Sequence, residues 1–186
     1  MKVHVGGIQG VGKDTLIDLV STTQPGIPVI HFAQRMKEIG LASSHDALLR
    51  RVDKDTRKRL RDVVFEEIES YDSCFVNGHY ALPIRNVDSE AILGFEMGIP
   101  DEYVALFDSY LLIECPPESI LERRRDDIAR KRGNSLSNIV LELGVEKLFF
   151  NHTARSSAYS EVFKNEHLDS TAKRINDYLE KMRGGA

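Results

Sequence analysis

The sequence predicts an α/β domain of three layers, in which helices flank both faces of a mainly parallel five-stranded sheet. Short apolar segments alternate with longer helical patterns, as crossover connections between parallel strands require. A glycine-rich turn directly follows the first apolar segment. The length of 186 residues, with 41% apolar and 29% charged residues, suits one folded domain with a single sizeable core.

The first half of the chain supplies three of the predicted strands. After the apolar run at residues 2–6, Leu16, Leu19 and Val20 share one helical face, and a Gln-Pro-Gly break follows that helix. The predicted elements are strands over residues 2–6, 27–32 and 73–77, and helices over residues 13–21, 33–42 and 53–71.

The second half begins with residues 78–100, which show no regular pattern and are predicted to be irregular. Prolines open a helix that ends at Gly133, and a longer helical segment interrupted at Gly144 follows it. The predicted elements are strands over residues 109–115 and 161–164, and helices over residues 117–132 and 135–160. A last helix carries a stripe that predicts core packing: Leu168, Ala172, Ile175, Leu179 and Met182.

Charge and hydropathy exclude several classes of protein. With 25 basic and 29 acidic residues, the net charge of −4 argues against binding nucleic acid through a globally basic surface. No apolar run approaches the length of about 20 residues that crosses a bilayer, and residues 1–7 lead into a strand, so we expect a cytoplasmic protein without a membrane partner. Cys74 and Cys115 lie in apolar runs without further zinc ligands and are expected to be buried, reduced thiols.

The motif that carries chemistry stands between the first strand and the first helix. Residues 6–15 read GGIQGVGKDT and contain the pattern G-x-x-x-x-G-K from Gly7 to Lys13. Glycines permit torsions that turn amide N–H groups toward a phosphate, and the helix amino terminus and the lysine add positive charge. The candidate ATP-binding residues are Gly7, Gly10, Val11, Gly12, Lys13, Asp14 and Thr15.

The loop departs from the usual pattern at Asp14, where a Ser or Thr hydroxyl normally contacts Mg²⁺, and Thr15 comes one position later. A loop with a variable residue after the lysine is similar to those of nucleoside monophosphate kinases, which hold Mg²⁺ largely through phosphates and water. Two interpretations of Asp14 stay open. It acts on the metal, or it only favours the helix amino terminus through the helix dipole.

Most of the chain resembles the archaeal-type adenylate kinases. Beyond the loop, the resembling segments are His31-Phe32-Ala33, residues 50–59, residues 123–132, Asn151, and residues 162–165 with Leu168 and Thr171. The resemblance implies a P-loop NTPase fold in one domain over residues 1–186, an acceptor-binding helical region at about 33–72 and a short arginine-rich lid at about 123–135. It also implies ATP as the phosphoryl donor, Mg²⁺ as the cofactor and a nucleoside monophosphate as the acceptor, with AMP favoured.

Two features differ from that family. The third strand ends at Asn77, where the family carries an aspartate near the metal, so an acid and a neutral residue have exchanged places between positions 14 and 77. We expect Asp14 and Asn77 to act on the metal through water. Residues 82–97 show little resemblance, which leaves the acceptor base open, although His79 matches the family pattern and is a candidate acceptor-binding residue.

Basic residues concentrate in two windows, with seven in residues 50–61 and six in residues 123–132. The first window is typical of a solvated helix face, whereas the second precedes a Gly-Asn pair and is predicted to close over phosphates, where transfer needs positive charge. The candidate catalytic residues are Lys13, Arg123, Arg124, Arg130 and Arg132. Arg155 is either a further phosphate ligand or a surface salt-bridge partner, and Arg35 and Lys37 are candidates for the acceptor phosphate.

These residues predict a phosphotransferase that passes the ATP γ-phosphate directly to an acceptor phosphate. The alternatives are an RNA- or ribosome-associated P-loop ATPase that uses the basic windows as an RNA surface, and a kinase of another small molecule. The three share one fold, so dependence of turnover on the acceptor separates them.

Overall fold

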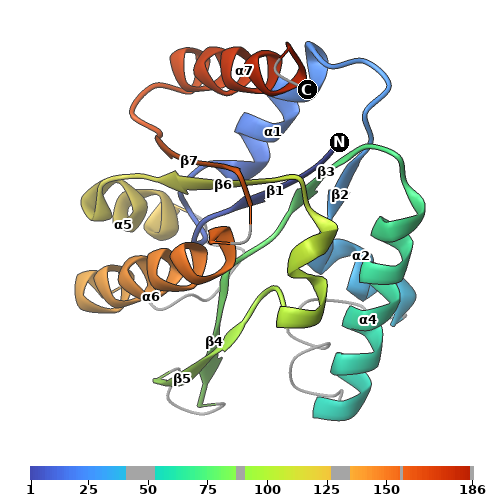
Figure 1. Ribbon diagram of the computed structural model, residues 1–186. Coiled ribbons are helices and arrows are strands. Elements are labelled where there is room, and N and C mark those ends of the chain that lie inside the picture. The colour runs from blue at the N-terminus through green and yellow to red at the C-terminus, as the bar shows by residue number, and fades with distance from the viewer. Residues whose placement is uncertain (41–52, 87–90, 127–134, 156, 185–186) are drawn as a thin grey trace.

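The main sheet has five parallel strands in the order β2-β3-β1-β6-β7 (Figure 1). The computed structural model describes residues 1–40, 53–86, 91–126, 135–155 and 157–184. The strands are β1 (Lys2–Gly6), β2 (Val29–His31), β3 (Cys74–Asn77), β6 (Ser109–Glu114) and β7 (Tyr159–Lys164). The prediction of a three-layer domain with a parallel five-stranded sheet is confirmed.

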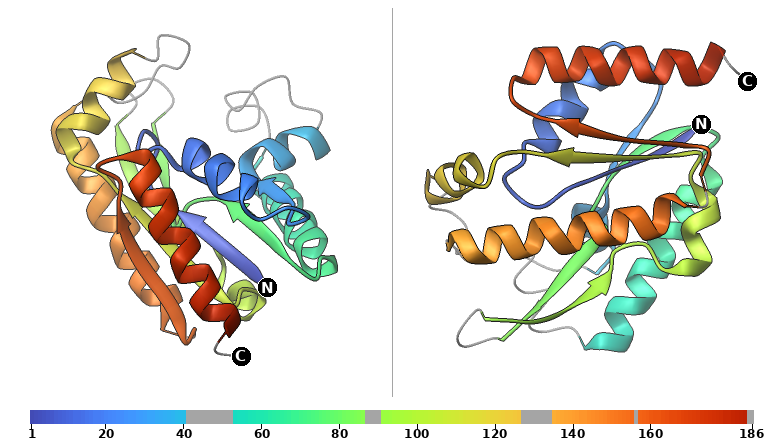
Figure 2. Two further views of the ribbon diagram at one scale, coloured as in Figure 1. Left: turned by 90° about the horizontal axis from the view of Figure 1, so that it is seen from above. Right: turned by 60° about the vertical axis from the view of Figure 1, so that its left-hand side comes forward.

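Helices cover both faces of this sheet. The helices are α1 (Lys13–Thr22), α2 (Phe32–Ile39), α4 (Lys54–Ser70), α5 (Pro117–Asp126), α6 (Leu136–Ala154) and α7 (Leu168–Gly184), with a 3₁₀ helix, η1, over Asp101–Leu106. Figure 2 shows α7 and α1 on the opposite side of the sheet from α6. Because side chains alternate along a strand, Leu111 of β6 packs into the α1 and α7 core and Leu112 into the α4 and α6 core.

Polar caps mark where two of the helices begin. The Asp53 carboxylate accepts the Thr56 N–H at 2.9 Å at the start of α4, and the Ser135 hydroxyl accepts the Asn138 N–H at 3.2 Å at the start of α6. The helix α6 continues through Gly144, which is exposed and where a Cβ would meet open space, so the predicted interruption there was wrong. It ends at Ala154, five residues before β7 begins.

The predicted irregular stretch contains a hairpin. Strand β4 (Ala81–Arg85) pairs antiparallel with β5 (Ile92–Met97) beside α6, away from the main sheet (Figure 1). The hairpin returns to its starting point because the Gly98 N–H donates to the Tyr80 carbonyl oxygen at 2.7 Å. A Cβ at Gly98 would overlap the His79 carbonyl oxygen, so this return requires glycine. In the described part of the chain, no helix combines the length and apolar character of a membrane span.

Candidate phosphate-binding site

The glycine-rich loop leaves the carboxyl end of β1 and enters α1. Gly7, Gly10 and Gly12 have φ angles of 143°, 95° and 90°, a region that favours glycine. A Cβ at Gly7 would lie 2.6 Å from the Ile113 carbonyl oxygen, and one at Gly12 would lie 2.7 Å from Asn165 Nδ2. Both torsion and space therefore require these glycines, which supports the predicted loop conformation.

Neighbouring elements hold the loop by its carbonyl oxygens. Arg124 Nε of α5 donates to the Gln9 oxygen at 3.0 Å, Arg123 Nη1 to the Gly10 oxygen at 3.0 Å, and Asn165 Nδ2 to the Val11 oxygen at 2.6 Å. In a trans peptide the N–H points away from the C=O. The anchored carbonyls therefore turn the following amides, including those of Gly10 and Gly12, toward the other side of the loop, where a phosphate can accept from them.

Lys13 opens α1 and is 7% exposed. Its ammonium donates to the carbonyl oxygens of Gly7 and, at 3.3 Å, Ile8. The charge is thus held against the same loop whose amides face the candidate phosphate position. Asp14 and Thr15 follow it as exposed residues in the first turn of α1.

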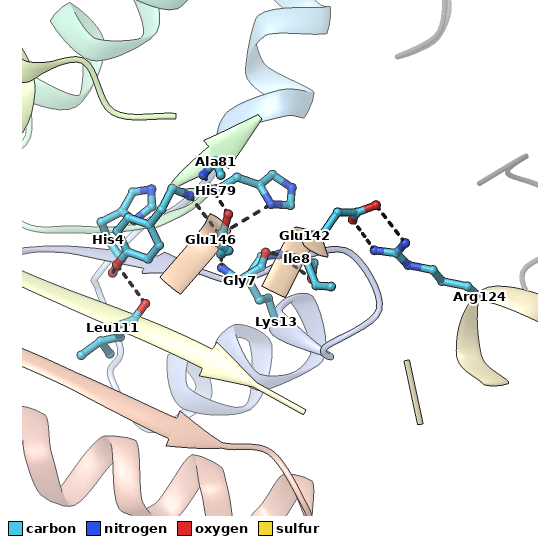
Figure 3. A network of polar contacts seen from close by, with 11 residues as sticks. His4, Gly7, Ile8, Lys13, His79, Ala81, Leu111, Arg124, Glu142 and Glu146 are labelled. Atoms are coloured by element: carbon cyan, nitrogen blue, oxygen red, sulfur yellow. Dashed lines mark hydrogen bonds and ion pairs between the residues drawn. The ribbon is translucent and has the colours of Figure 1, made fainter. Parts of the chain in front are cut away.

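The predicted lid arginines have different environments. Arg124 is 2% exposed, and its Nη2 donates to Glu142 Oε2 of α6 at 2.7 Å (Figure 3). Arg123 is exposed and touches the loop at Gly10. Residues 123–126 continue α5, within the helix predicted over residues 117–132, so Arg123 and Arg124 lie in its last turn. Arg130 and Arg132 lie outside the described residues, so their role in a lid stays a prediction.

The exchanged pair, Asp14 and Asn77, lies together at the carboxyl end of β3. Asn77 Nδ2 donates to Asp14 Oδ1 and lies 3.0 Å from His31 Nδ1. The described residues contain no cluster of three or more metal-ligating His, Cys, Asp or Glu side chains. One carboxylate and one amide oxygen beside a phosphate loop fit Mg²⁺, because this ion prefers oxygen ligands, keeps several waters and takes phosphates as ligands.

The acceptor candidates lie on two segments. Arg35 of α2 pairs with Glu67 of α4 at 2.7 Å and with Glu38 at 3.1 Å, and Lys37 lies in the last turn of α2. His79 follows β3, with Nδ1 3.9 Å from Glu146 Oε1. Arg155 ends α6 near Ser157, whose hydroxyl donates to the Asp108 carbonyl oxygen before β6. Arg155 therefore lies near the amino-terminal ends of the strands, whereas the phosphate loop and the other described candidates lie at the carboxyl-terminal ends.

Sequence reasoning missed Glu146, which is 1% exposed on α6. Its Oε1 accepts the N–H groups of Gly7 at 2.8 Å and Tyr80 at 2.9 Å, and its Oε2 accepts the Ala81 N–H at 2.7 Å (Figure 3). The available signal was the spacing of Glu142 and Glu146, four residues apart in an otherwise largely apolar helix. Charged side chains are almost never fully buried unless they are paired, so glutamates among apolar residues indicate partners elsewhere in the chain.

The same reasoning missed Tyr80 and its relation to Gly6. The Tyr80 ring crosses β1 so closely that a Cβ at Gly6 would overlap it, and the Tyr80 hydroxyl donates to the Leu111 carbonyl oxygen at 3.0 Å. The Tyr80 ring therefore packs against the end of β1 from which the loop begins.

With this geometry established, comparisons with known proteins give the family. A family model described as an AAA domain matches residues 6–140, which is most of the chain. The adenylate kinase of Methanoculleus marisnigri is 30% identical over 142 residues, covering 70% of this chain and 71% of that protein. The adenylate kinase of Thermoplasma volcanium is 26% identical over 174 residues, covering 89% and 91%. This chain belongs to the AAA-domain family and is a relative of the archaeal adenylate kinases.

Solved structures of low sequence identity to this chain share its fold. Shikimate kinase from Bacteroides thetaiotaomicron has a TM-score of 0.67 at 14% identity, with 97% of this chain and 98% of that chain covered. A gluconokinase from Sinorhizobium meliloti has a TM-score of 0.56 at 12% identity, with 97% and 92% covered. The predictions of a P-loop fold and of a phosphotransferase are confirmed, whereas the acceptor is a matter for the proposal below.

One buried histidine of this chain, His4, predicts that its stability depends on pH. His4 of β1 is 2% exposed, and burial, together with the charge of Lys13, lowers its pKa from the ordinary 6.5 to about 3. The folded chain keeps His4 neutral while the unfolded chain protonates it, so the stability present above pH 6.5 falls as the pH falls toward 3. Between pH 7 and pH 5 we expect a loss of about 2 kcal/mol from this residue.

The test compares urea unfolding of the wild type and His4→Leu at pH 7 and pH 5. Packing changes are common to both pH values, so the difference of differences isolates the titration of position 4. We expect the wild type to lose about 2 kcal/mol more than the variant. Equal losses would show that His4 is protonated inside the fold.

Proposed function

We propose that this protein is a Mg²⁺- and ATP-dependent nucleoside monophosphate kinase, with AMP as its favoured acceptor. The observation that carries the proposal is a phosphate loop with anchored carbonyls and a buried lysine, in a chain related to adenylate kinases. The amides of that loop would hold the donor phosphates, and Lys13 would turn from the Gly7 and Ile8 carbonyls to the β- and γ-phosphates.

The proposed reaction is direct in-line transfer of the γ-phosphoryl group to an acceptor phosphate oxygen. That oxygen is already anionic at neutral pH, so no strong general base is needed, and the chain contributes positioning and charge. Arg123, which already touches the loop at Gly10, would contribute charge to the transferring oxygens. Bound Mg²⁺ would neutralise charge on the donor phosphates, with Asp14 and Asn77 holding its waters.

A second candidate function is phosphorylation of a small molecule other than a nucleotide. The observation in its favour is the β4–β5 hairpin. This hairpin spans the part of the chain that least resembles adenylate kinases, and it lies next to His79. The same fold supports shikimate kinase and gluconokinase, so the fold does not choose among acceptors.

Acceptor dependence tests both candidates. Radiolabelled ATP is incubated with each nucleoside monophosphate, with shikimate, with gluconate and with RNA, and labelled products are separated. We expect labelled ADP from AMP, and none from the Lys13→Ala protein prepared in parallel. Labelling of shikimate or gluconate alone would replace the proposal by the second candidate, and RNA-stimulated release of phosphate without acceptor labelling would favour the ATPase alternative.

The Asp14–Asn77 contact predicts a metal phenotype. Asp14→Ser removes the carboxylate, so we expect the Mg²⁺ concentration for half-maximal activity to rise about tenfold at saturating ATP. The double variant Asp14→Ser with Asn77→Asp returns a carboxylate to the same contact and should restore most of the affinity. Titrating Mg²⁺ against initial rate measures both effects.

The alternative role of Asp14 at the helix amino terminus gives a different result. An unchanged half-saturation point in Asp14→Ser, with a loss of stability of about 0.5 kcal/mol in urea unfolding, would remove Asp14 from the metal site.

A further inference from the structure

We propose that Glu146 is a positioning residue for phosphoryl transfer, which fixes the phosphate loop and the start of the β4–β5 hairpin to each other. The inference rests on the proposed function, and it names a residue that acts through the backbone rather than on substrate. Glu146 accepts one N–H group from the loop, at Gly7, and two from the hairpin, at Tyr80 and Ala81. One buried carboxylate therefore joins two segments more than 70 positions apart.

The energetic setting makes this connection rigid. Glu146 is 1% exposed, and burial raises the pKa of its carboxyl although three backbone N–H groups and the charge of Lys13 favour the ionised form. A buried carboxylate without such partners is strongly disfavoured. The three amides and the carboxylate consequently hold one another, and movement of either segment would leave polar groups unpaired.

The two peptide groups that flank Gly7 show why the loop conformation depends on this contact. The Gly7 N–H is bound to Glu146, and the Gly7 carbonyl oxygen accepts from Lys13. The first residue of the loop is thus held through the peptide groups before and after it, and the contact with Lys13 links it to the side chain expected to reach the donor phosphates.

A second glutamate, one helical turn earlier, makes a parallel connection. Glu142 accepts from Arg124 (Figure 3). Arg124 also holds the Gln9 carbonyl oxygen, and Arg85 at the end of β4 donates to Glu142 as well. Glu146 therefore connects the start of β4 to the start of the phosphate loop. Glu142 connects the end of β4, through Arg124, to the middle of the phosphate loop. The helix α6 thus holds the loop and the hairpin at a fixed distance from each other.

The functional consequence concerns the distance between the donor and acceptor phosphates. In-line transfer needs donor and acceptor phosphates held in a near-attack arrangement, and a displacement of about 1 Å can lower the rate about a hundredfold. The loop would hold the donor, and His79, a candidate acceptor-binding residue, lies directly before the hairpin. A variant that weakens the Glu146 contacts should lower kcat with little change in KM for ATP, because Arg123, Arg124 and Asn165 still hold the loop carbonyls whose following amides bind phosphate.

Glu146→Gln is the sharpest variant because its side chain has almost the same shape. A glutamine has one oxygen and one NH₂ group, so it can accept from Gly7 and Tyr80 or from Ala81, but it presents a donor to the remaining N–H. We expect kcat to fall about tenfold to a hundredfold, with KM for ATP within about threefold of the wild type.

The matched control is Leu179→Ala, at a fully buried position of α7 on the opposite face of the sheet. It should lower stability by about 2–5 kcal/mol. Both proteins are assayed where circular dichroism shows complete folding, with the best acceptor from the panel above. A fall in kcat of the same size in Leu179→Ala would mean that Glu146 only stabilises the fold, and it would overturn the proposal.

Hydrogen exchange supplies a readout that does not depend on the acceptor. In Glu146→Gln we expect faster amide exchange in both residues 5–12 and residues 78–84, whereas Leu179→Ala should not affect these segments selectively. In the wild type, a non-hydrolysable ATP analogue should slow exchange in both segments together, and this measurement stands even if the variant does not fold. Protection confined to residues 5–12, or a kcat within twofold of the wild type in folded Glu146→Gln, would overturn the positioning role. If no nucleoside monophosphate is accepted, the proposed function fails, while the exchange results still decide on Glu146.

Discussion

Replacing Arg124 by alanine should lower the free energy of unfolding by about 3 kcal/mol, the lower end of the range for breaking a buried ion pair, because Arg85 still pairs with Glu142. Arg124 and Glu142 are 2% and 6% exposed at their side chains, and two N–H···O contacts join them at 2.7 and 3.4 Å. The variant also leaves the Gln9 carbonyl oxygen without the Arg124 donor. Urea unfolding at constant salt measures the change.

The neighbouring Arg123 provides the comparison. It is exposed, and its contact with the loop is one hydrogen bond to the Gly10 carbonyl oxygen. Arg123→Ala should therefore change stability by less than about 1 kcal/mol while lowering kcat, since its charge is free to reach phosphates. Equal stability losses in the two variants would contradict the difference in burial on which this prediction depends.

Replacing Lys13 by alanine should lower kcat about a hundredfold or more while leaving the chain folded. The ammonium is the cation built into the loop, and losing a charge-assisted contact to a transferring phosphate costs about 3 kcal/mol. The lost hydrogen bonds to Gly7 and Ile8 are contacts to backbone oxygens, each worth only about 1 kcal/mol in stability.

Single-turnover kinetics with the wild type and Lys13→Ala at saturating ATP measure this effect, with circular dichroism as the check on folding. Lys13→Arg keeps the charge but changes its geometry, so we expect it to recover little activity. Wild-type-like turnover in folded Lys13→Ala would remove the phosphate-loop assignment.

The elements that the sequence predicted are those with local signals. All five strands of the main sheet were predicted because apolar runs alternate with helical periodicity. The hairpin was not, because Pro83 and Gly94 interrupt its short strands and both residues are unfavourable in strand interiors. Its stability comes from α6 and from the return at Gly98, which are tertiary features.

The candidate site likewise contains residues with a local sequence signal and residues without one. The phosphate loop is a contiguous motif, so Gly7 to Lys13 could be predicted as candidates from their spacing between a strand and a helix. Three adjacent arginines at the end of α5 look equivalent in composition, yet the helical phase separates them. Arg124 lies four residues after the fully buried Ile120 and so shares its inward face. The spacing of Glu142 and Glu146 was a signal, but their partners, Arg124 and the amides of Gly7, Tyr80 and Ala81, come from other segments, so the pairing itself carries no local signal.

The return of the hairpin at Gly98 bears on how this protein can evolve. The chain leaves the domain core at Tyr80 and rejoins it at Gly98 through one hydrogen bond of 2.7 Å. Lengthening a closed loop changes its entropy only slowly, so insertions between β4 and β5, beyond the contacts of β4 with Glu142 and Glu146, are inexpensive for the rest of the fold. Divergent lineages can therefore lengthen the hairpin while keeping the phosphate loop and these contacts. Selection would retain glycine at position 98, since any Cβ there meets the His79 backbone.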